Sequence, residues 1–186
     1  MEKKQFSKLH PNDAIEILLE DELFEPAWLY CYKKEFWFKH NFKYIKGRIH
    51  EDFGLTPLIL MNAKNISSID YAGYNYIIRD GSIMNSKNPE KDYKKFTDCL
   101  EYFKENKLLI NKSSNINAKT KQLLLSYYAN GILNRATILE KESLSKALTE
   151  IKKEKIYSYL KDDTISRKLK KGLVKIFPKI YIKRLK

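Results

Sequence analysis

The amino-acid sequence predicts an α/β domain over residues 1–88, followed by a basic α-helical extension over residues 89–186. Residues 66–78 are rich in β-branched and aromatic side chains and end at an Arg-Asp-Gly-Ser turn signal, which indicates one or two strands. Beyond this turn the apolar residues recur at helical spacing. The charge changes at the same place: residues 1–90 hold 12 basic and 13 acidic side chains, and residues 91–186 hold 24 and 10.

The first 40 residues indicate short elements. Asn12 or Asp13 suits the N-cap of an amphipathic helix over residues 14–23. Residues 27–32 are aromatic and suit a buried strand, whereas residues 33–40 suit a short helix. Periodicity does not decide between helix and strand in this aromatic stretch.

The next segments predict a loop and then a helix. Residues 41–50 are polar and contain Gly47, which favours a loop. Residues 51–63 have the apolar spacing of a helix. Glu51 and Asp52 lie in its first turn, where the helix dipole favours acids.

The second half contains three helical patterns. They cover residues 93–108, 118–129 and 138–160, with a polar connector at residues 111–117. The last two patterns meet around Gly131, which predicts a break there.

The C-terminal tail, residues 164–186, holds nine Lys and Arg side chains and no acid. Five apolar residues fall on one face of a helix: Leu169, Leu173, Ile176, Phe177 and Ile180. Pro178 should kink or end this helix. The pattern is typical of a helix that lies in an anionic membrane surface; the alternative is that the apolar face packs on the domain.

Composition and generic motifs narrow the function classes. Cys31 and Cys99 lack metal-ligand spacing and suit a reducing compartment. The first residues are polar, unlike a signal peptide, and no apolar run approaches the ~18 residues of a spanning helix. We therefore predict a cytoplasmic protein, held peripherally at the inner face of the membrane by its tail. Glycine-rich phosphate loops, nucleophile elbows and zinc motifs are absent.

The Glu51-Asp52 pair is the most informative candidate site. Adjacent side chains on a helix point about 100° apart, so the two carboxylates cannot both face the same cleft. Taken alone, two acids that stabilise a helix N-terminus are the simpler interpretation.

Four motifs in order add context to this pair. They are Trp28-x-x-x-Tyr32-Lys33-x-Glu35-Phe36, Gly47-x-x-x-Glu51-Asp52, Ala63-Lys64-x-Ile66 and Tyr74-x-Tyr76-x-x-Arg79-x-Gly81-Ser82-Ile83. Their order and intervals over residues 12–88 resemble the acceptor-side, C-terminal part of family 2 glycosyltransferases, which have the GT-A fold. The resemblance implies that residues 1–88 form a partial GT-A-like subdomain.

The resemblance also implies roles for single residues. Asp52 would be the catalytic base that deprotonates an acceptor hydroxyl, and Glu51 would orient the loop or the acceptor. Arg79 and Ser82 match a segment near the donor diphosphate; a surface arginine is the alternative for Arg79. Trp28 would stack on a sugar, unless it is a core residue.

The resemblance stops at the donor side of such enzymes. Their nucleotide-binding half, with a D-x-D motif for Mg²⁺ or Mn²⁺, has no counterpart here. We therefore expect the complete enzyme to use Mg²⁺ or Mn²⁺, and this chain alone to bind no metal and to be inactive. The implied reaction moves a sugar from a nucleotide sugar to a saccharide or lipid-linked acceptor, in cell-surface polysaccharide synthesis.

Two other functions fit the composition. One is a non-catalytic basic binding module for nucleic acid or a partner protein, and the other is a regulatory pseudo-subunit of a transferase. The basic side chains are spread over several helices without a recognisable reading motif, so no nucleic acid is expected as a partner.

Overall fold

The computed structural model describes residues 5–20, 24–77 and 88–184, and their regular elements are all helices. The elements are α1 (Pro11–Glu20), the 3₁₀ turn η1 (Ala27–Leu29), α2 (Lys34–Lys39), α3 (Glu51–Asn62), α4 (Pro89–Lys112), α5 (Ala118–Thr137), α6 (Lys141–Lys153), the 3₁₀ turn η2 (Ile156–Tyr159), α7 (Ile165–Ile176) and α8 (Pro178–Arg184).

The predicted α/β class, and with it the partial GT-A-like subdomain, is wrong: the described parts of the chain form an all-helical fold. Beyond the bridge at Ile66, residues 67–77 have no regular secondary structure and are mostly exposed. A single antiparallel bridge joins Leu9 and Ile66, with two N–H···O distances of 2.9 Å. Residues 27–32 contain η1 instead of a strand. β-branched composition favours extended backbone, but a sheet also needs a partner strand for its hydrogen bonds.

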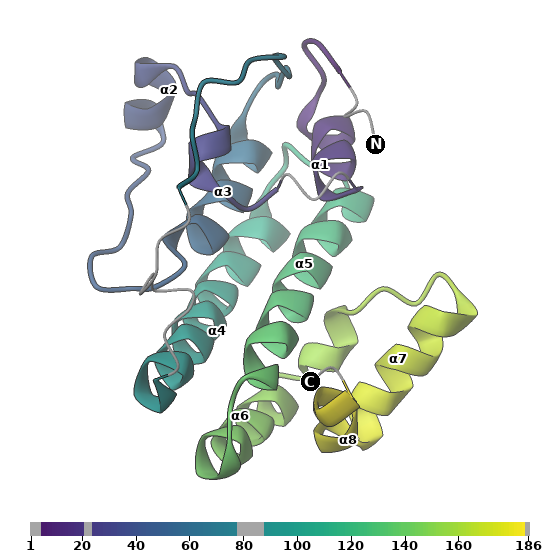
Figure 1. The fold of residues 1–186 in the computed structure, drawn as a ribbon. Coiled ribbons are helices and arrows are strands. Elements are labelled where there is room, and N and C mark those ends of the chain that lie inside the picture. Colours follow the sequence, from purple (N-terminus) through teal and green to yellow (C-terminus); the bar gives the residue numbers. More distant parts are fainter. Residues whose placement is uncertain (1–4, 21–23, 78–87, 185–186) are drawn as a thin grey trace.

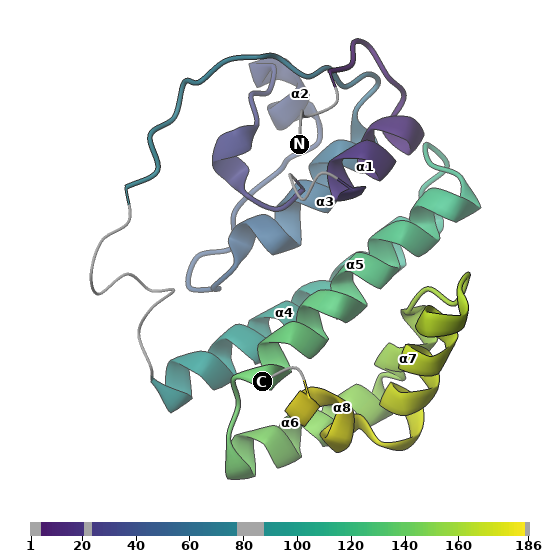
Figure 2. The ribbon, with the colours of Figure 1, turned by 45° about the vertical axis from the view of Figure 1, so that its right-hand side comes forward.

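The long helices α4 and α5 form the centre of the molecule. Both views show them side by side, with α1, α2 and α3 on one side and α6, α7 and α8 on the other (Figure 1, Figure 2). The α4 and α5 helices begin at asparagine caps, where Asn88 accepts from the Lys91 N–H and Asn117 from the Thr120 N–H. Local capping and apolar spacing therefore define the central pair.

The predicted break at Gly131 is also wrong, because α5 continues through this residue to Thr137. A Cβ atom at Gly131 would clash with the ring of Phe53. This glycine thus allows α3 to approach α5 closely and does not end the helix.

The main core joins residues from both sides of residue 88. Its largest fully buried side chains include Phe53, Phe96, Phe103 and Tyr128. A buried polar network fixes α3 on the central pair: Asn106 Nδ2 donates to the Gly54 carbonyl at 2.6 Å, and the Tyr128 hydroxyl donates to the same oxygen at 3.2 Å. Satisfied buried groups of this kind hold a helix in one position.

Gly54 is a point of close packing that a mutation can test. A Cβ atom there would overlap the ring of buried Tyr102, whereas a Cβ atom at Gly172 in α7 meets nothing within 4 Å. We expect Gly54→Ala to lower the free energy of unfolding by about 1–3 kcal/mol through overpacking. Gly172→Ala should raise it by ~0.5–1 kcal/mol, because alanine is the better helix former. Urea denaturation measures both, and an equal effect of the two variants would exclude this packing.

Candidate functional site

The loop that precedes α3 is held on α4 by Arg48. Its guanidinium makes two hydrogen bonds of 2.8 and 2.7 Å with the Glu105 carboxylate and lies 3.2 Å from Glu101. It also lies over the Tyr102 ring, 4.8 Å from the ring centre. A two-point guanidinium–carboxylate pair fixes orientation as well as distance, so α4 positions the start of α3.

Two further contacts define the turn into α3. The Ile49 N–H donates to the Asp98 carboxylate at 2.7 Å, and Lys94 pairs with the same carboxylate at 2.8 Å. His50 then adopts a left-handed conformation with φ of 58° and ends the loop. The predicted helix over residues 51–63 is confirmed as α3 and begins at Glu51.

Asp52 lies in a cluster of three titratable groups. One ligand atom each from Glu25, His50 and Asp52 falls within 4.8 Å of the others, and all three residues are half-buried. The Asp52 Oδ1 atom accepts from the Phe53 N–H at 2.8 Å. Glu51, its neighbour, is exposed. The first turn of α3 therefore directs one acid inward and the other to solvent.

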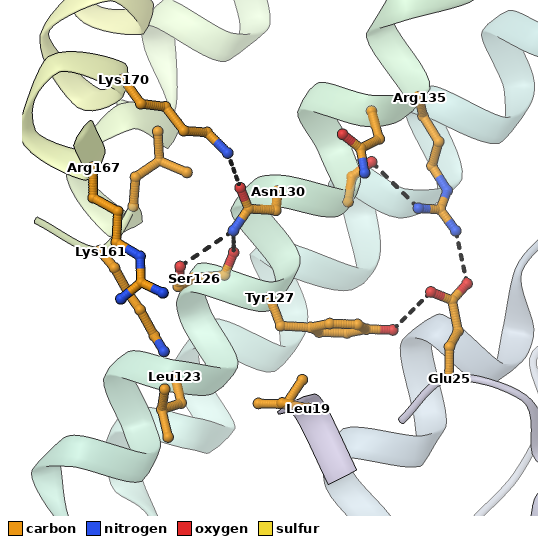
Figure 3. Close-up of a pocket in the computed structure, with 13 residues that line it drawn as sticks. Leu19, Glu25, Leu123, Ser126, Tyr127, Asn130, Arg135, Lys161, Arg167 and Lys170 are labelled. Carbon is orange, nitrogen blue, oxygen red and sulfur yellow. Dashed lines mark hydrogen bonds and ion pairs between the residues drawn. The ribbon is translucent and has the colours of Figure 1, made fainter. Parts of the chain in front are cut away.

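Glu25 also contacts two side chains of α5, as Figure 3 shows. Arg135 Nη2 lies 2.8 Å from one Glu25 oxygen, and the Tyr127 hydroxyl donates to the other at 3.1 Å. The Arg135 guanidinium also lies 4.5 Å from the centre of the Phe53 ring. Arg135 thus neutralises Glu25, whereas Asp52 forms no salt bridge within the described part of the chain.

Burial controls the protonation of the cluster. It raises the pKa of Asp52 above the usual 3.8, and the charges of Glu25 and Glu51 add to the effect. Burial also lowers the pKa of His50 to about 4, helped by the positive charges of Arg135 and Lys95. A neutral imidazole therefore stands beside a carboxylate that accepts a proton more readily than an ordinary aspartate.

The cluster is a poor site for Mg²⁺. Its donors are two carboxylates and one imidazole, whereas Mg²⁺ prefers sets of oxygen ligands. The Arg135 guanidinium already occupies one face of Glu25 and repels a cation. The arrangement suits proton transfer better than metal binding.

Trp28 forms an exposed aromatic surface with Tyr74 and Tyr76. It lies in η1, is 44% exposed, and stacks on Tyr74 with ring centres 4.9 Å apart and planes 12° apart. Tyr76 stacks on it at 5.9 Å. Trp28 follows Glu25 by three residues, which places their Cα atoms within about 11 Å. An exposed aromatic surface thus lies close in the chain to the carboxylate cluster.

Two other predicted site residues, Arg79 and Ser82, lie outside the described residues. Sequence reasoning missed Glu25, His50 and Arg135 as members of the cluster. Glu25 and Arg135 are 110 positions apart, so no local spacing connects them. Only the helical packing brings them together.

The tail exposes an apolar face. Ile165 and Leu169 are 80% and 70% exposed, and Ile176, Phe177 and Ile180 are exposed as well. The opposite side of the tail packs on the domain through Val174 and Ile182, which are buried. The α7 helix ends before Pro178, as predicted, and this proline begins α8. Among the described helices, none has both the length and the apolar character to cross a bilayer.

The lowered pKa of His50 gives stability a pH dependence. The unfolded chain binds this proton near the usual 6.5, and the folded protein only near about 4. Between these values the unfolded state binds more protons, so the free energy of unfolding falls as the pH falls. We expect His50→Gln to lose less stability than the wild type between pH 6.5 and 4. The raised pKa of Asp52 acts in the opposite direction but is common to both proteins. Urea denaturation at pH 6.5 and at pH 4 measures this loss for both proteins. An equal loss of the free energy of unfolding in the two proteins would contradict the burial of a neutral His50.

Comparison with known proteins covered family models, curated proteins and solved structures. No family model, no curated protein and no solved structure matches the chain.

Proposed function

We propose that the chain is the acceptor-side part of a sugar-transferring enzyme, with Asp52 as the general base. The observation that carries the proposal is the half-buried Asp52 carboxylate, which has a raised pKa and forms no salt bridge among the described residues. The resemblance of the residue 12–88 motifs to family 2 glycosyltransferases supports the same reaction. The proposal concerns the reaction and its residues, and the fold that carries them is helical.

The proposed step is a nucleophilic substitution at the anomeric carbon of a nucleotide sugar. Asp52 takes the proton of an acceptor hydroxyl, and the oxygen forms a bond to the anomeric carbon. The bond from that carbon to the diphosphate oxygen breaks, and the nucleoside diphosphate leaves with the electron pair. Exposed Glu51 orients the acceptor. In the complete enzyme, a nucleotide-binding half would hold the nucleotide sugar and Mg²⁺ or Mn²⁺.

The acceptor is a saccharide, free or lipid-linked. The exposed, nearly parallel rings of Trp28 and Tyr74 present a flat apolar surface of the kind that stacks on a sugar ring. Trp28 lies three residues after Glu25, whose carboxylate lies beside Asp52.

Attachment to an anionic membrane surface is the second part of the proposal. The exposed face of Ile165, Leu169 and Ile176 lies beside a row of lysines at residues 168, 171 and 175. Apolar burial and charge attraction together favour a helix in the plane of the membrane surface. A cytoplasmic chain attached to the inner face in this way would meet lipid-linked acceptors.

The acceptor role is tested by saccharide binding to the wild type and to Trp28→Ala. Loss of the stacking surface should weaken binding by about tenfold, because a stacked aromatic ring contributes ~1 kcal/mol or more. Phe38→Ala, at an exposed aromatic on α2, is the matched control and should bind as the wild type does. Calorimetry with oligosaccharides from a glycan array gives the affinities. Equal affinities for all three proteins would refute the acceptor surface.

A further inference from the structure

A pocket of about 340 Å³ lies between α5 and residues 160–170, and Leu19 and Glu25 also line it. Four cationic side chains and one acid line it. Arg135 pairs with the acid, Glu25, at 2.8 Å. The other three cations, Lys161, Arg167 and Lys170, come from residues 161–170, which include the start of the tail (Figure 3). This segment therefore adds positive charge to the pocket that no lining acid neutralises.

The partners of these cations leave donors available. Lys170 Nζ donates to the neutral amide oxygen of Asn130 at 2.7 Å. Arg167 uses one nitrogen, Nη1, for Asp163, a residue outside the pocket lining. Lys161 forms no salt bridge with the described acids. An anion in the pocket would meet several N–H donors at once, the arrangement that suits a phosphate group.

The remaining walls are hydroxyl and apolar. Ser126 is buried, and its Oγ accepts from Asn130 Nδ2 at 3.3 Å, so its own proton remains for a ligand oxygen. Figure 3 shows Ser126 on the side of Asn130 that faces Lys161 and Arg167. Leu19, Leu123 and Leu160 complete the lining. A pocket with a cationic end and an apolar wall fits an anionic group joined to an uncharged body.

We propose that this pocket binds the phosphate or diphosphate group of an organic phosphate ester, through Lys161, Lys170, Arg167 and Ser126. The volume is at the lower end for ligand sites, which suits a phosphate group with a small part of its ester. The pocket shares Glu25 and Arg135 with the Asp52 cluster, but the groups proposed to bind phosphate lie outside that cluster, and the proposal does not rest on sugar transfer.

The first test is calorimetry with inorganic pyrophosphate at constant salt. We expect saturable binding to the wild type, and a loss of at least about tenfold in affinity for Lys161→Gln/Lys170→Gln. Lys168→Gln/Lys179→Gln removes the same charge at exposed tail positions outside the pocket and should change the affinity by less than about twofold. No saturable binding up to ~10 mM, or equal loss in both variants, would overturn the proposal.

A second measurement needs only the wild-type protein. Pyrophosphate should protect Lys161 and Lys170 from chemical acetylation, read by mass spectrometry, and leave Lys168 reactive. Equal acetylation of all three with and without pyrophosphate counts against the pocket, whatever the folding of the variants.

Vesicles then identify the source of the phosphate. Phosphatidylcholine vesicles with phosphatidic acid carry a terminal phosphate, whereas those with phosphatidylglycerol at equal surface charge do not. A preference for phosphatidic acid that Lys161→Gln/Lys170→Gln removes assigns the pocket to a lipid headgroup. Pyrophosphate binding without this preference assigns it to a soluble phosphate ester.

Discussion

Replacing Ile165 and Leu169 with Ser is expected to lower partitioning onto anionic vesicles by at least about a hundredfold, because each buried aliphatic side chain contributes ~1.5–3 kcal/mol. Both side chains point to solvent and touch little of the domain, so the fold should be unchanged. Co-sedimentation with vesicles that contain phosphatidylglycerol gives the partition coefficients. The lysines beside the apolar face remain, and the residual binding should fall further as salt is added.

The matched control lies on α4. Leu108 and Leu109 are adjacent exposed leucines outside the tail, and their replacement with Ser should leave partitioning unchanged. Deletion of residues 164–186 is a poorer test, because it would also remove Val174 and Ile182 from the core. Equal pelleting of the tail variant, the control and the wild type would exclude the tail as the membrane contact.

Asp52→Asn is expected to lower the rate of sugar transfer by about two to four orders of magnitude in the complete enzyme, the usual contribution of a positioned base. Asparagine keeps the size of the side chain and an oxygen that can accept from the Phe53 N–H. Folding and donor binding should therefore stay near the wild type. The amide cannot take the acceptor proton, so the loss should be in kcat and not only in KM.

Glu51→Gln separates this account from a purely structural role of the two acids. Glu51 is exposed and orients the acceptor in our proposal, so its replacement should cost much less in rate. If the acids served only the helix terminus, Asp52→Asn would change the free energy of unfolding by ~1 kcal/mol or less and leave the rate intact. Rates and melting temperatures of both variants distinguish the two accounts.

Local sequence signals predicted the helices well and the sheet wrongly. The α3 helix begins at the predicted residue, and the asparagine caps and apolar spacing of α4 and α5 are visible in the sequence. Residues 66–77 have the composition of a strand but form only the bridge at Ile66, because strand formation depends on a partner that composition does not reveal. The break predicted at Gly131 is wrong for a related reason: the missing Cβ atom leaves room for the ring of Phe53, which belongs to a helix distant in sequence.

In the candidate site, too, local features could be predicted and contacts between distant residues could not. The position of Asp52 at the start of a helix could be predicted from its loop and from the family resemblance. Its surroundings could not, because Glu25, Arg135 and the clamp of Arg48 on Glu105 join residues 57 to 110 positions apart. These contacts hold the segments before η1 and before α3 on α5 and α4, and no periodicity encodes them.

The most direct test of the central claim is the pH dependence of sugar transfer by the complete enzyme, wild type and Asp52→Asn. Loss of activity in acid should follow protonation of Asp52, at a pKa above the usual 3.8 of this side chain. The variant should be slower by about a hundredfold or more and should lack this acid limb. A variant that keeps more than about a tenth of the wild-type rate, or the same acid limb, would show that Asp52 is not the base.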